Sequence, residues 1–363
     1  MRIHLRFALA ATAALLLAAC GGGGSDSPTP APVQPTVAIS AGNQEAVAAT
    51  AANAVISVGS FAAATPLATG ERVVAAGKTG GSAAFAVRAG SLGAAIRRLA
   101  LDAALAPISV DTSVKFESVV RALGTVTTNP PCPGGGSLTI MLNDADNSGG
   151  ASPGDSASIT FNQCRPAPDE LVTGTVTVVY VSLTATPTRT VVGATVSYSN
   201  IAATSPDGSF SLNGSLSLSA AREGTLDTAT LVVGASGLTA SVTAVLPVYT
   251  DTLTFGAGLT IVATADSAAV PPGGGAAGLS TARLDGAISS TRLGGTIVIA
   301  TVTPVQQYDI DPFPRAGQLV ATGAGGSRLR LTAVSTTTLR IELDANGDGT
   351  YESLVERPWG DVL

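Results

Sequence analysis

The strongest constraint on the fold lies between Cys132 and Cys164, where two short runs of alternating residues flank a turn rich in Asp, Asn, Ser and Gly. Apolar side chains recur at every second position of both runs, at Leu138, Ile140 and Leu142 and then at Ala157, Ile159 and Phe161. A period of two places such side chains on one face of a half-buried β-strand. The stretch therefore predicts a β-hairpin with a long acidic tip and a cysteine outside each strand.

The same alternation continues beyond this hairpin and predicts strands to the end of the chain. In residues 209–219 apolar side chains alternate with Ser and Asn, so that one face is apolar and the other is polar. This pattern is typical of an antiparallel sheet with one solvated face. Turn sequences such as PDG at 206–208 and NGDG at 346–349 separate the runs. The further runs span residues 172–183, 191–201, 230–248, 253–263, 284–290, 296–302, 328–333, 339–344 and 350–355.

Glycines recur in the middle of these runs and predict strong curvature. Glycine weakens a strand locally, so its repeated use indicates bends or bulges. The positions are Gly174, Gly193, Gly214, Gly286 and Gly295. We therefore expect an all-β, mainly antiparallel domain over residues 129–363, built as a large curved sheet, a sandwich or an incomplete barrel.

A small helical or mixed segment is expected before the sheet, over residues 37–128. The Ala-rich run at 43–56 predicts one helix, and residues 113–123 predict a short one. In residues 85–105, apolar side chains recur near helical spacing, at Phe85, Leu92, Ile96, Leu99 and Ala103. We expect these helices to pack on the sheet, with a movable lid over a cavity as the alternative. Trp359, the only tryptophan, is expected to close the edge of the core.

The first twenty residues carry the features of an export signal. Arg2 and Arg6 precede an apolar stretch at 7–17 that is short for a membrane span. The residues LAAC at 17–20 resemble the lipobox of bacterial lipoproteins. That resemblance implies cleavage after residues 1–19, which form the signal peptide, and lipid modification of Cys20. Gly21, where the family's retention signal is Asp, implies passage to the outer membrane, and an ordinary secretory signal with an accidental cysteine is the alternative.

Residues 20–36 are expected to form the lipid anchor and a tether, because a Gly/Ser start is followed by a stiffer Pro-rich piece. Several acyl chains on Cys20 would anchor the protein durably, since one chain binds only marginally. With its lipobox, tether and Asp-rich hairpins, the chain resembles uncharacterised envelope lipoproteins of Gram-negative bacteria, and the resemblance implies no activity. The expected location is the outer membrane, facing the periplasm or the cell surface.

Cysteine use agrees with export. Of three cysteines, removal of Cys20 leaves Cys132 and Cys164, an even number in an exported chain. An oxidising compartment favours one disulfide between them, and two free thiols are the alternative.

Charge and residue absences exclude several classes of function. Loss of the signal leaves 17 basic residues against 25 acidic ones, a net charge of −8, which disfavours binding to nucleic acid and to anionic lipid surfaces. The only histidine is His4, inside the signal. The mature chain therefore cannot build a Ser-His-Asp triad, a Cys-His pair or a histidine-based metal site. An oxidised cysteine pair also removes a thiol nucleophile.

The first candidate site is the hairpin tip between residues 144 and 155. Oxygen-bearing side chains occupy positions 1, 3, 5, 9 and 12 of a twelve-residue calcium loop, at Asp144, Asp146, Ser148, Ser152 and Asp155. The spacing resembles that of EF-hand and dockerin loops, although the flanks are strands and position 12 is Asp instead of Glu. The resemblance implies Ca²⁺ binding in the range of roughly 10⁻⁴–10⁻³ M. The alternative is a tip whose Asp, Asn and Ser side chains satisfy their own backbone.

The second candidate site lies in residues 344–352. Asp344, Asn346, Asp348 and Glu352 occupy positions 1, 3, 5 and 9, but Val355 stands at the closing position 12. Glu356 could take that role. Turn formation alone is the alternative, because Asn-Gly and Asp-Gly both favour tight turns.

Three classes of function fit this sequence. The leading class is a non-enzymatic lipoprotein of the outer membrane with a structural or interaction role, stabilised by Ca²⁺ and held to the membrane by its lipid. The second is a binder or carrier of a hydrophobic ligand, housed in an apolar cavity of the sheet. The third is a carboxylate-based hydrolase, which needs paired acids across a cleft. No nucleic-acid partner is expected, and the sequence does not identify a protein or ligand partner.

Overall fold

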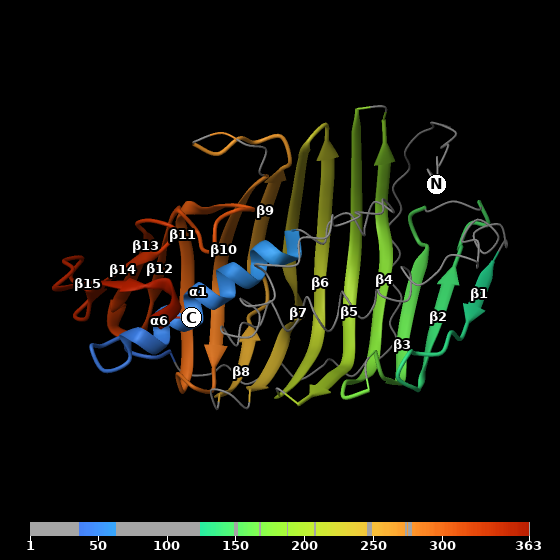
Figure 1. The fold of residues 1–363 in the computed structure, drawn as a ribbon, viewed down its shortest axis with the longest axis horizontal. Helices are drawn as coiled ribbons and strands as arrows, with labels where there is room; N and C mark the ends of the chain where they lie inside the picture. Colours follow the sequence, from blue (N-terminus) through green and yellow to red (C-terminus); the bar gives the residue numbers. More distant parts are fainter. Residues whose placement is uncertain are drawn as a thin grey trace, which may run out of the picture.

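The computed structural model describes residues 36–62, 124–148, 152–166, 168–186, 188–206, 208–244, 249–272, 274 and 278–362. In this part of the chain, fifteen strands form a single sheet, and every strand pair is antiparallel. Figure 1 shows the strands side by side from β1 at one edge to β15 at the other. The expectation of an all-β, mainly antiparallel fold is confirmed, and the form is one large curved sheet.

The strands are β1 Thr125–Thr128, β2 Ser137–Asn143, β3 Ser156–Cys164, β4 Leu171–Ala185, β5 Arg189–Ser205, β6 Gly208–Glu223, β7 Leu226–Ala244, β8 Tyr249–Phe255, β9 Thr260–Asp266, β10 Leu279–Ser290, β11 Gly295–Tyr308, β12 Ala316–Thr322, β13 Arg328–Ala333, β14 Thr338–Asp344 and β15 Ser353–Pro358. The helices are α1 Gln44–Ala62, the 3₁₀ turn η3 Ala324–Gly326 and α6 Trp359–Val362. Most strands pair with their neighbours in sequence, as hairpin connections require.

The exception to neighbour pairing lies between β7 and β10. Both β8 and β9 pair with β7 and with β10, so they lie end to end in one strand position. The sequence predicted one strand over residues 253–263, and this was wrong. A turn at residues 256–259 interrupts it, closed by a hydrogen bond from Leu259 N–H to the Gly256 carbonyl at 3.1 Å.

A line of irregularities crosses the sheet and bends it. Pairing shifts register between β3 and β4, β4 and β5, β5 and β6, β6 and β7, β10 and β11, and β11 and β12. Glycines with positive φ sit at four of these shifts, at Gly174, Gly214, Gly286 and Gly317. Bulges increase local twist and bend a sheet. The curvature predicted from Gly174, Gly193, Gly214 and Gly286 is confirmed, whereas Gly295 only pairs with Ser290 beside a turn.

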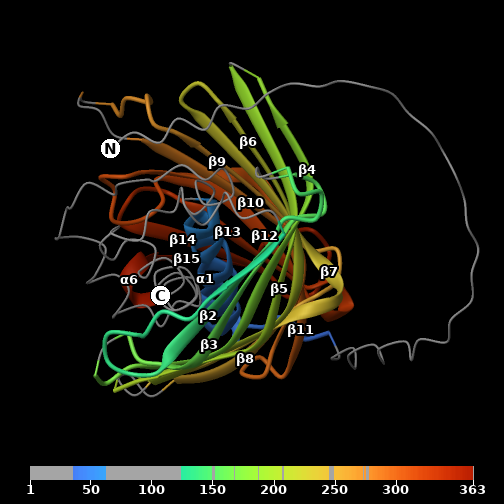
Figure 2. The same ribbon diagram turned by 90° about the vertical axis from the view of Figure 1, so that its right-hand side faces the viewer.

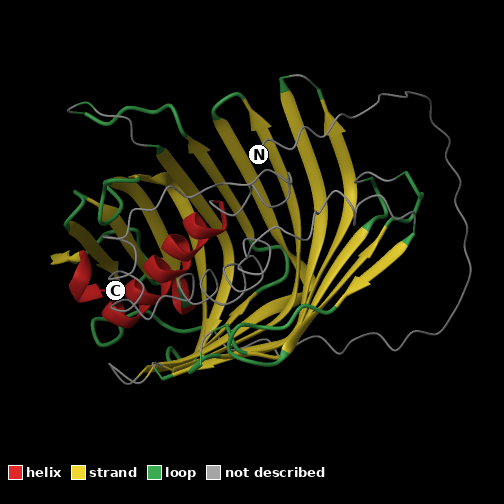
Figure 3. Cartoon of the chain, turned by 45° about the vertical axis from the view of Figure 1, so that its right-hand side comes forward, coloured by secondary structure: helices red, strands yellow, loops and turns green. Residues whose placement is uncertain are grey.

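Helix α1 lies on the concave side of this curved sheet (Figures 2 and 3). It packs chiefly on β9, β10 and β13. Its buried residues are small, because a close approach of helix to sheet leaves little room: Val47, Ala48, Ala51, Ala52, Ala54 and Val55. The helix predicted at 43–56 is confirmed and continues to Ala62. The helices predicted at 85–105 and 113–123 lie outside the described residues.

The chain just before α1 is fixed to the sheet. Val37 N–H donates to the Thr296 carbonyl at 3.0 Å, and Ala324 N–H donates to the Val37 carbonyl at 2.8 Å. Two residues further on, Ile39 N–H donates to Ser327 Oγ at 2.9 Å. Residues 36–39 therefore contact the sheet at the end of the strands where β11 and β13 begin.

The end of the chain closes the core beside α1. Trp359 is 4% exposed, and its Nε1–H donates to the Ser335 carbonyl at 3.1 Å. Its ring stacks on Phe313 with 6.0 Å between the centroids. The role expected for Trp359 at the edge of the core is confirmed.

Candidate functional site

The predicted disulfide is present and closes the first hairpin. Cys132 and Cys164 are bonded, with 5.5 Å between their Cα atoms, and both are buried. Backbone hydrogen bonds tie the same corner together, from Gly134 N–H to the Arg165 carbonyl and from Arg165 N–H to the Gly135 carbonyl. The crosslink thus fixes the end of β2 and β3 that lies opposite the acidic tip.

The first acidic loop, residues 144–155, joins β2 to β3 and gathers three carboxylates. Oxygens of Asp144, Asp146 and Asp155 lie within 4.8 Å of one another. Asp155 is buried and closes the loop, because it accepts hydrogen bonds from Ala145 N–H at 2.8 Å and from Ser152 N–H at 2.7 Å. The described residues of this loop therefore bring together positions 1, 3 and 12 of the predicted site.

The two serines of the loop lie beside Asp146. The Ser148 hydroxyl, followed by the Ser152 hydroxyl and the Ser148 N–H, lowers the pKa of Asp146 from 3.8 to about 2. Ser148 N–H donates to Asp146 Oδ1 at 2.9 Å. Ser152 Oγ is buried and makes no hydrogen bond of good geometry within the described part of the chain. The Ser152 oxygen therefore lies beside Asp146 with its hydrogen-bonding capacity unsatisfied.

The second acidic loop, residues 344–352, joins β14 to β15. Oxygens of Asp344, Asp348 and Glu352 lie within 4.8 Å of one another. Asp344 is fully buried and accepts hydrogen bonds from Gly347 N–H at 2.7 Å and from Gly349 N–H at 3.0 Å. A buried carboxylate at the start of the loop therefore organises the turn, as Asp155 does at the end of the first loop.

The outer residues of the second loop bind one another. Asn346 Oδ1 accepts a hydrogen bond from Asp348 N–H at 2.8 Å, and Asn346 Nδ2 donates to Asp348 Oδ2 at 3.1 Å. The Thr350 N–H, followed by the Asn346 side chain, lowers the pKa of Asp348. Glu352 accepts a hydrogen bond from Ala345 N–H at 3.1 Å. Asn346 thus lies against Asp348.

Two contacts at the base of the second loop were not predicted from the sequence. Glu356, considered as a closing ligand, instead forms an ion pair with Arg340 at 2.8 Å on the neighbouring strand. Tyr351 lies under the guanidinium of Arg330, 4.0 Å from its ring centroid. Arg330 also pairs with Glu342 across β13 and β14. These contacts fix the base of the loop, and none of them involves Asp344, Asp348 or Glu352.

The two loops lie at opposite ends of the strands and near opposite edges of the sheet. The first follows β2, and the second follows β14 on the side where β11 and β13 begin. Gly347 of the second loop packs against Gly326, which follows the Ala324 that binds Val37. The segment that precedes α1 therefore joins the sheet beside the second acidic loop.

One buried carboxylate was not anticipated. Asp251 lies on β8 and accepts hydrogen bonds from Ser290 Oγ at 2.8 Å, Thr291 Oγ1 at 3.0 Å and Arg292 N–H at 3.1 Å. It is 1% exposed and joins β8 to the turn after β10. The alternation that puts Leu253 and Phe255 inward also puts Asp251 inward, and this was the available signal. Its satisfied hydrogen bonds indicate a structural role.

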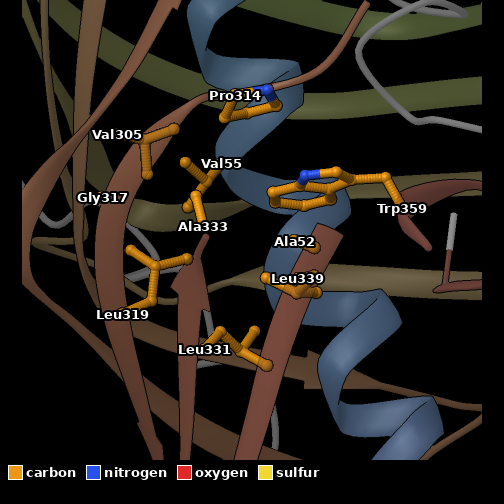
Figure 4. Close-up of a pocket in the computed structure, with 10 residues that line it drawn as sticks. All are labelled: Ala52, Val55, Val305, Pro314, Gly317, Leu319, Leu331, Ala333, Leu339 and Trp359. Carbon is orange, nitrogen blue, oxygen red and sulfur yellow. The ribbon is translucent and has the colours of Figure 1, made fainter. Parts of the chain in front are cut away.

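The concave face contains a small apolar pocket between α1 and strands β11 to β14 (Figure 4). Its volume is about 20 Å³, which is room for about one water molecule. Val55, Leu339 and Trp359 are among the side chains that line it. This part of the concave face is therefore filled by side chains to a degree that leaves no space for an acyl chain.

Comparison with protein-family models, curated proteins and solved structures finds no match for this chain. Cys20, the signal at residues 1–19 and the tether up to residue 35 lie outside the described residues. Among the helices that the structure describes, none combines the length and the apolar character of a membrane span.

Proposed function

We propose that this chain is a non-enzymatic lipoprotein of the bacterial outer membrane, anchored through Cys20, with a structural or interaction role, and that Ca²⁺ stabilises its acidic loops. The anchor is supported by the lipobox-like residues 17–20 and the Gly/Pro tether that follows them. The proposal of Ca²⁺ binding depends on one observation, that each loop gathers three carboxylates at a hairpin tip. A disulfide-closed sheet suits a rigid scaffold outside the cytoplasm.

The distances within each loop fit a shared cation. Calcium binds oxygen ligands at about 2.3–2.6 Å, so two ligands of one ion lie up to about 5 Å apart. The carboxylate oxygens in each loop lie within 4.8 Å of one another. The first loop adds the unsatisfied Ser152 oxygen, so we propose it as the stronger of the two sites. Bound Ca²⁺ would offset the mutual repulsion of the three acids and fix the tip.

The tether suggests how the scaffold is oriented. Fifteen residues lie between Cys20 and Thr36, so these two residues are at most about 55 Å apart when the chain is fully extended. Thr36 and Val37 join the sheet beside the second loop. In the proposed arrangement, this end of the strands faces the bilayer and the first loop points away from it. Cation binding by the second loop would then reduce its repulsion from anionic headgroups.

Calorimetric titration of the mature protein with CaCl₂ tests the calcium part. We expect uptake with a dissociation constant on the order of 10⁻⁴–10⁻³ M. Ca²⁺ at ten times that constant should stabilise the fold by about 1.4 kcal/mol. Asp146→Asn should abolish uptake by the first loop, whereas Asp169→Asn, an exposed acid outside both loops, should leave it unchanged. Absence of both heat and any rise in Tm for the wild-type protein would end the calcium proposal.

The alternative of a hydrophobic-ligand carrier has less support from the described residues. Its requirement is an apolar cavity of ligand size, and the pocket under α1 has a volume of about 20 Å³. A carboxylate-based hydrolase needs acids that face each other across a cleft. The acidic groups gathered in the two loops instead sit at hairpin tips and bind their own backbone.

A further inference from the structure

Two Asn-Gly pairs occur in the chain, at Asn213-Gly214 and Asn346-Gly347. In such a pair the backbone nitrogen of glycine can attack the side-chain carbonyl carbon of asparagine. Glycine carries no Cβ to obstruct that approach and lets the backbone reach the required geometry. The two pairs share this intrinsic reactivity, so the fold around each decides whether the reaction occurs in the folded protein.

At the second pair, the electrophile is exposed to water, the nucleophile is half-buried, and both are held by hydrogen bonds. Asn346 is exposed at the tip of the second acidic loop. Gly347 N–H donates to Asp344 Oδ1 at 2.7 Å, and the Asn346 amide is bound to Asp348 by two hydrogen bonds. A carboxylate acceptor stabilises the protonated nitrogen, which must lose its proton before it attacks. The loop thus restrains both reacting groups.

We infer that Asn346 is a site of spontaneous deamidation in the folded protein, that Asp344 controls its rate, and that the product adds a fourth carboxylate to the second acidic loop. The inference depends on the loop alone and holds whether or not the loop binds Ca²⁺.

The reaction is balanced without an oxidant or a cofactor. The Gly347 nitrogen loses its proton to water or hydroxide and forms a bond to Cγ of Asn346, and the side-chain nitrogen leaves as ammonia. The resulting succinimide is opened by one water molecule. Attack of water at the backbone carbonyl carbon breaks its bond to the Gly347 nitrogen and gives isoaspartate at position 346, in which the main chain runs through the side chain. Attack at Cγ breaks the new Cγ–N bond and gives aspartate. The net change is asparagine and water to a carboxylic acid and ammonia.

The product changes the chemistry of the loop. Asn346 Nδ2 now donates to Asp348 Oδ2 at 3.1 Å. A carboxylate in its place cannot donate, so attraction becomes repulsion between two acids. With Asp344 and Glu352, the loop then contains four carboxylates in place of three. Deamidation therefore makes the tip more dependent on a cation, or opens it where none is bound.

The first pair provides an internal comparison. Asn213 and Gly214 lie in the middle of β6, paired on one side with β5 and on the other with β7. Asn213 Oδ1 also accepts a hydrogen bond from Asn200 N–H at 2.6 Å. Attack by the Gly214 nitrogen requires these central strands to separate, whereas attack by the Gly347 nitrogen requires only a local opening of the loop.

The test follows deamidation of both asparagines in the full mature chain by mass spectrometry of tryptic peptides after incubation at mildly alkaline pH. The diagnostic peptides are Thr190–Arg222 and Ile341–Leu363, because trypsin does not cleave before Pro358. In urea both sites should react at similar rates. In the folded protein, Asn346 should react about 10- to 100-fold more slowly than in urea, and Asn213 on the order of 10³-fold or more. Equal protection of the two sites in the folded protein would overturn the inference.

A second measurement tests the control by Asp344. Asp344→Asn keeps the shape of the side chain but weakens its hydrogen bond to Gly347, so Asn346 should react several-fold faster in the folded state. Asp155→Asn removes the corresponding buried acid of the first loop and should leave the rate at Asn346 unchanged. If Asp344→Asn does not raise the deamidation rate at Asn346 while Asn213 remains protected, the inference is also overturned. The protection of Asn213 reports in each sample that the sheet is folded.

Discussion

Single residues set the bend of this sheet and the shape of its acidic loops. At Gly214, with φ of 122°, an added Cβ would overlap the Gly237 carbonyl of the next strand. Asp155 and Asp344 act similarly in their loops, since each accepts two backbone N–H groups that its hairpin tip would otherwise leave unpaired. The oxygen spacing predicted which acids would meet, but not that these two would be buried, because burial depends on neighbouring strands.

A substitution at the bend tests the role of the close approach. Gly214→Ala should lower the free energy of unfolding by about 2–5 kcal/mol, from an unfavourable φ and from the forced separation of β6 and β7. Gly224→Ala is the control, because Gly224 has φ of 61° but no atom within 4 Å of the added Cβ. It should cost about 1 kcal/mol. Equal losses for the two variants in urea unfolding would show that the bend does not depend on close backbone contact.

At the scale of elements, alternation predicted most strands because each buries one face and exposes the other. β1 and β12 were not predicted, since β1 has only four residues and β12 buries only Leu319 and Ala321, which leaves little alternation to recognise. β1 pairs with β2 and so belongs to the sheet, although it precedes residue 129. The end-to-end placement of β8 and β9 could not be predicted, because it depends on β7 and β10 pairing with both. The helix α1 was predicted, but its position on the concave face was not, because that position depends on the curvature of the sheet.

Loss of the disulfide should weaken the edge formed by β1, β2 and β3. The bond closes a loop with a sequence separation of 32 residues. The double variant Cys132→Ser/Cys164→Ser should therefore lose about 3–4 kcal/mol of unfolding free energy by the chain-entropy estimate. Urea unfolding measures the loss, and hydrogen exchange should locate faster opening in β2 and β3. An unchanged midpoint would mean that packing of Leu138 and Phe161 alone fixes this edge.

At the scale of the whole molecule, the described chain is one curved sheet with α1 on its concave side (Figure 3). An acidic hairpin tip lies near each edge of this sheet. The segment before α1 joins the sheet beside one of these tips. If the tether leads to the membrane, the sheet has a membrane-facing end and a distal end, each with a candidate cation site. Removal of the proposed signal at residues 1–19 would leave a net charge of −8, which would favour attachment by lipid over electrostatic attraction.

The proposed function depends above all on attachment of this scaffold to the outer membrane through Cys20. Mass spectrometry of the N-terminal fragment from protein expressed in a Gram-negative host and extracted from its membranes tests it most directly. We expect a chain that starts at Cys20 and carries acyl groups, and a Cys20→Ser variant that is absent from the membrane fraction. A chain that retains Met1, or a processed chain with an unmodified Cys20, would show that the protein is not a lipoprotein.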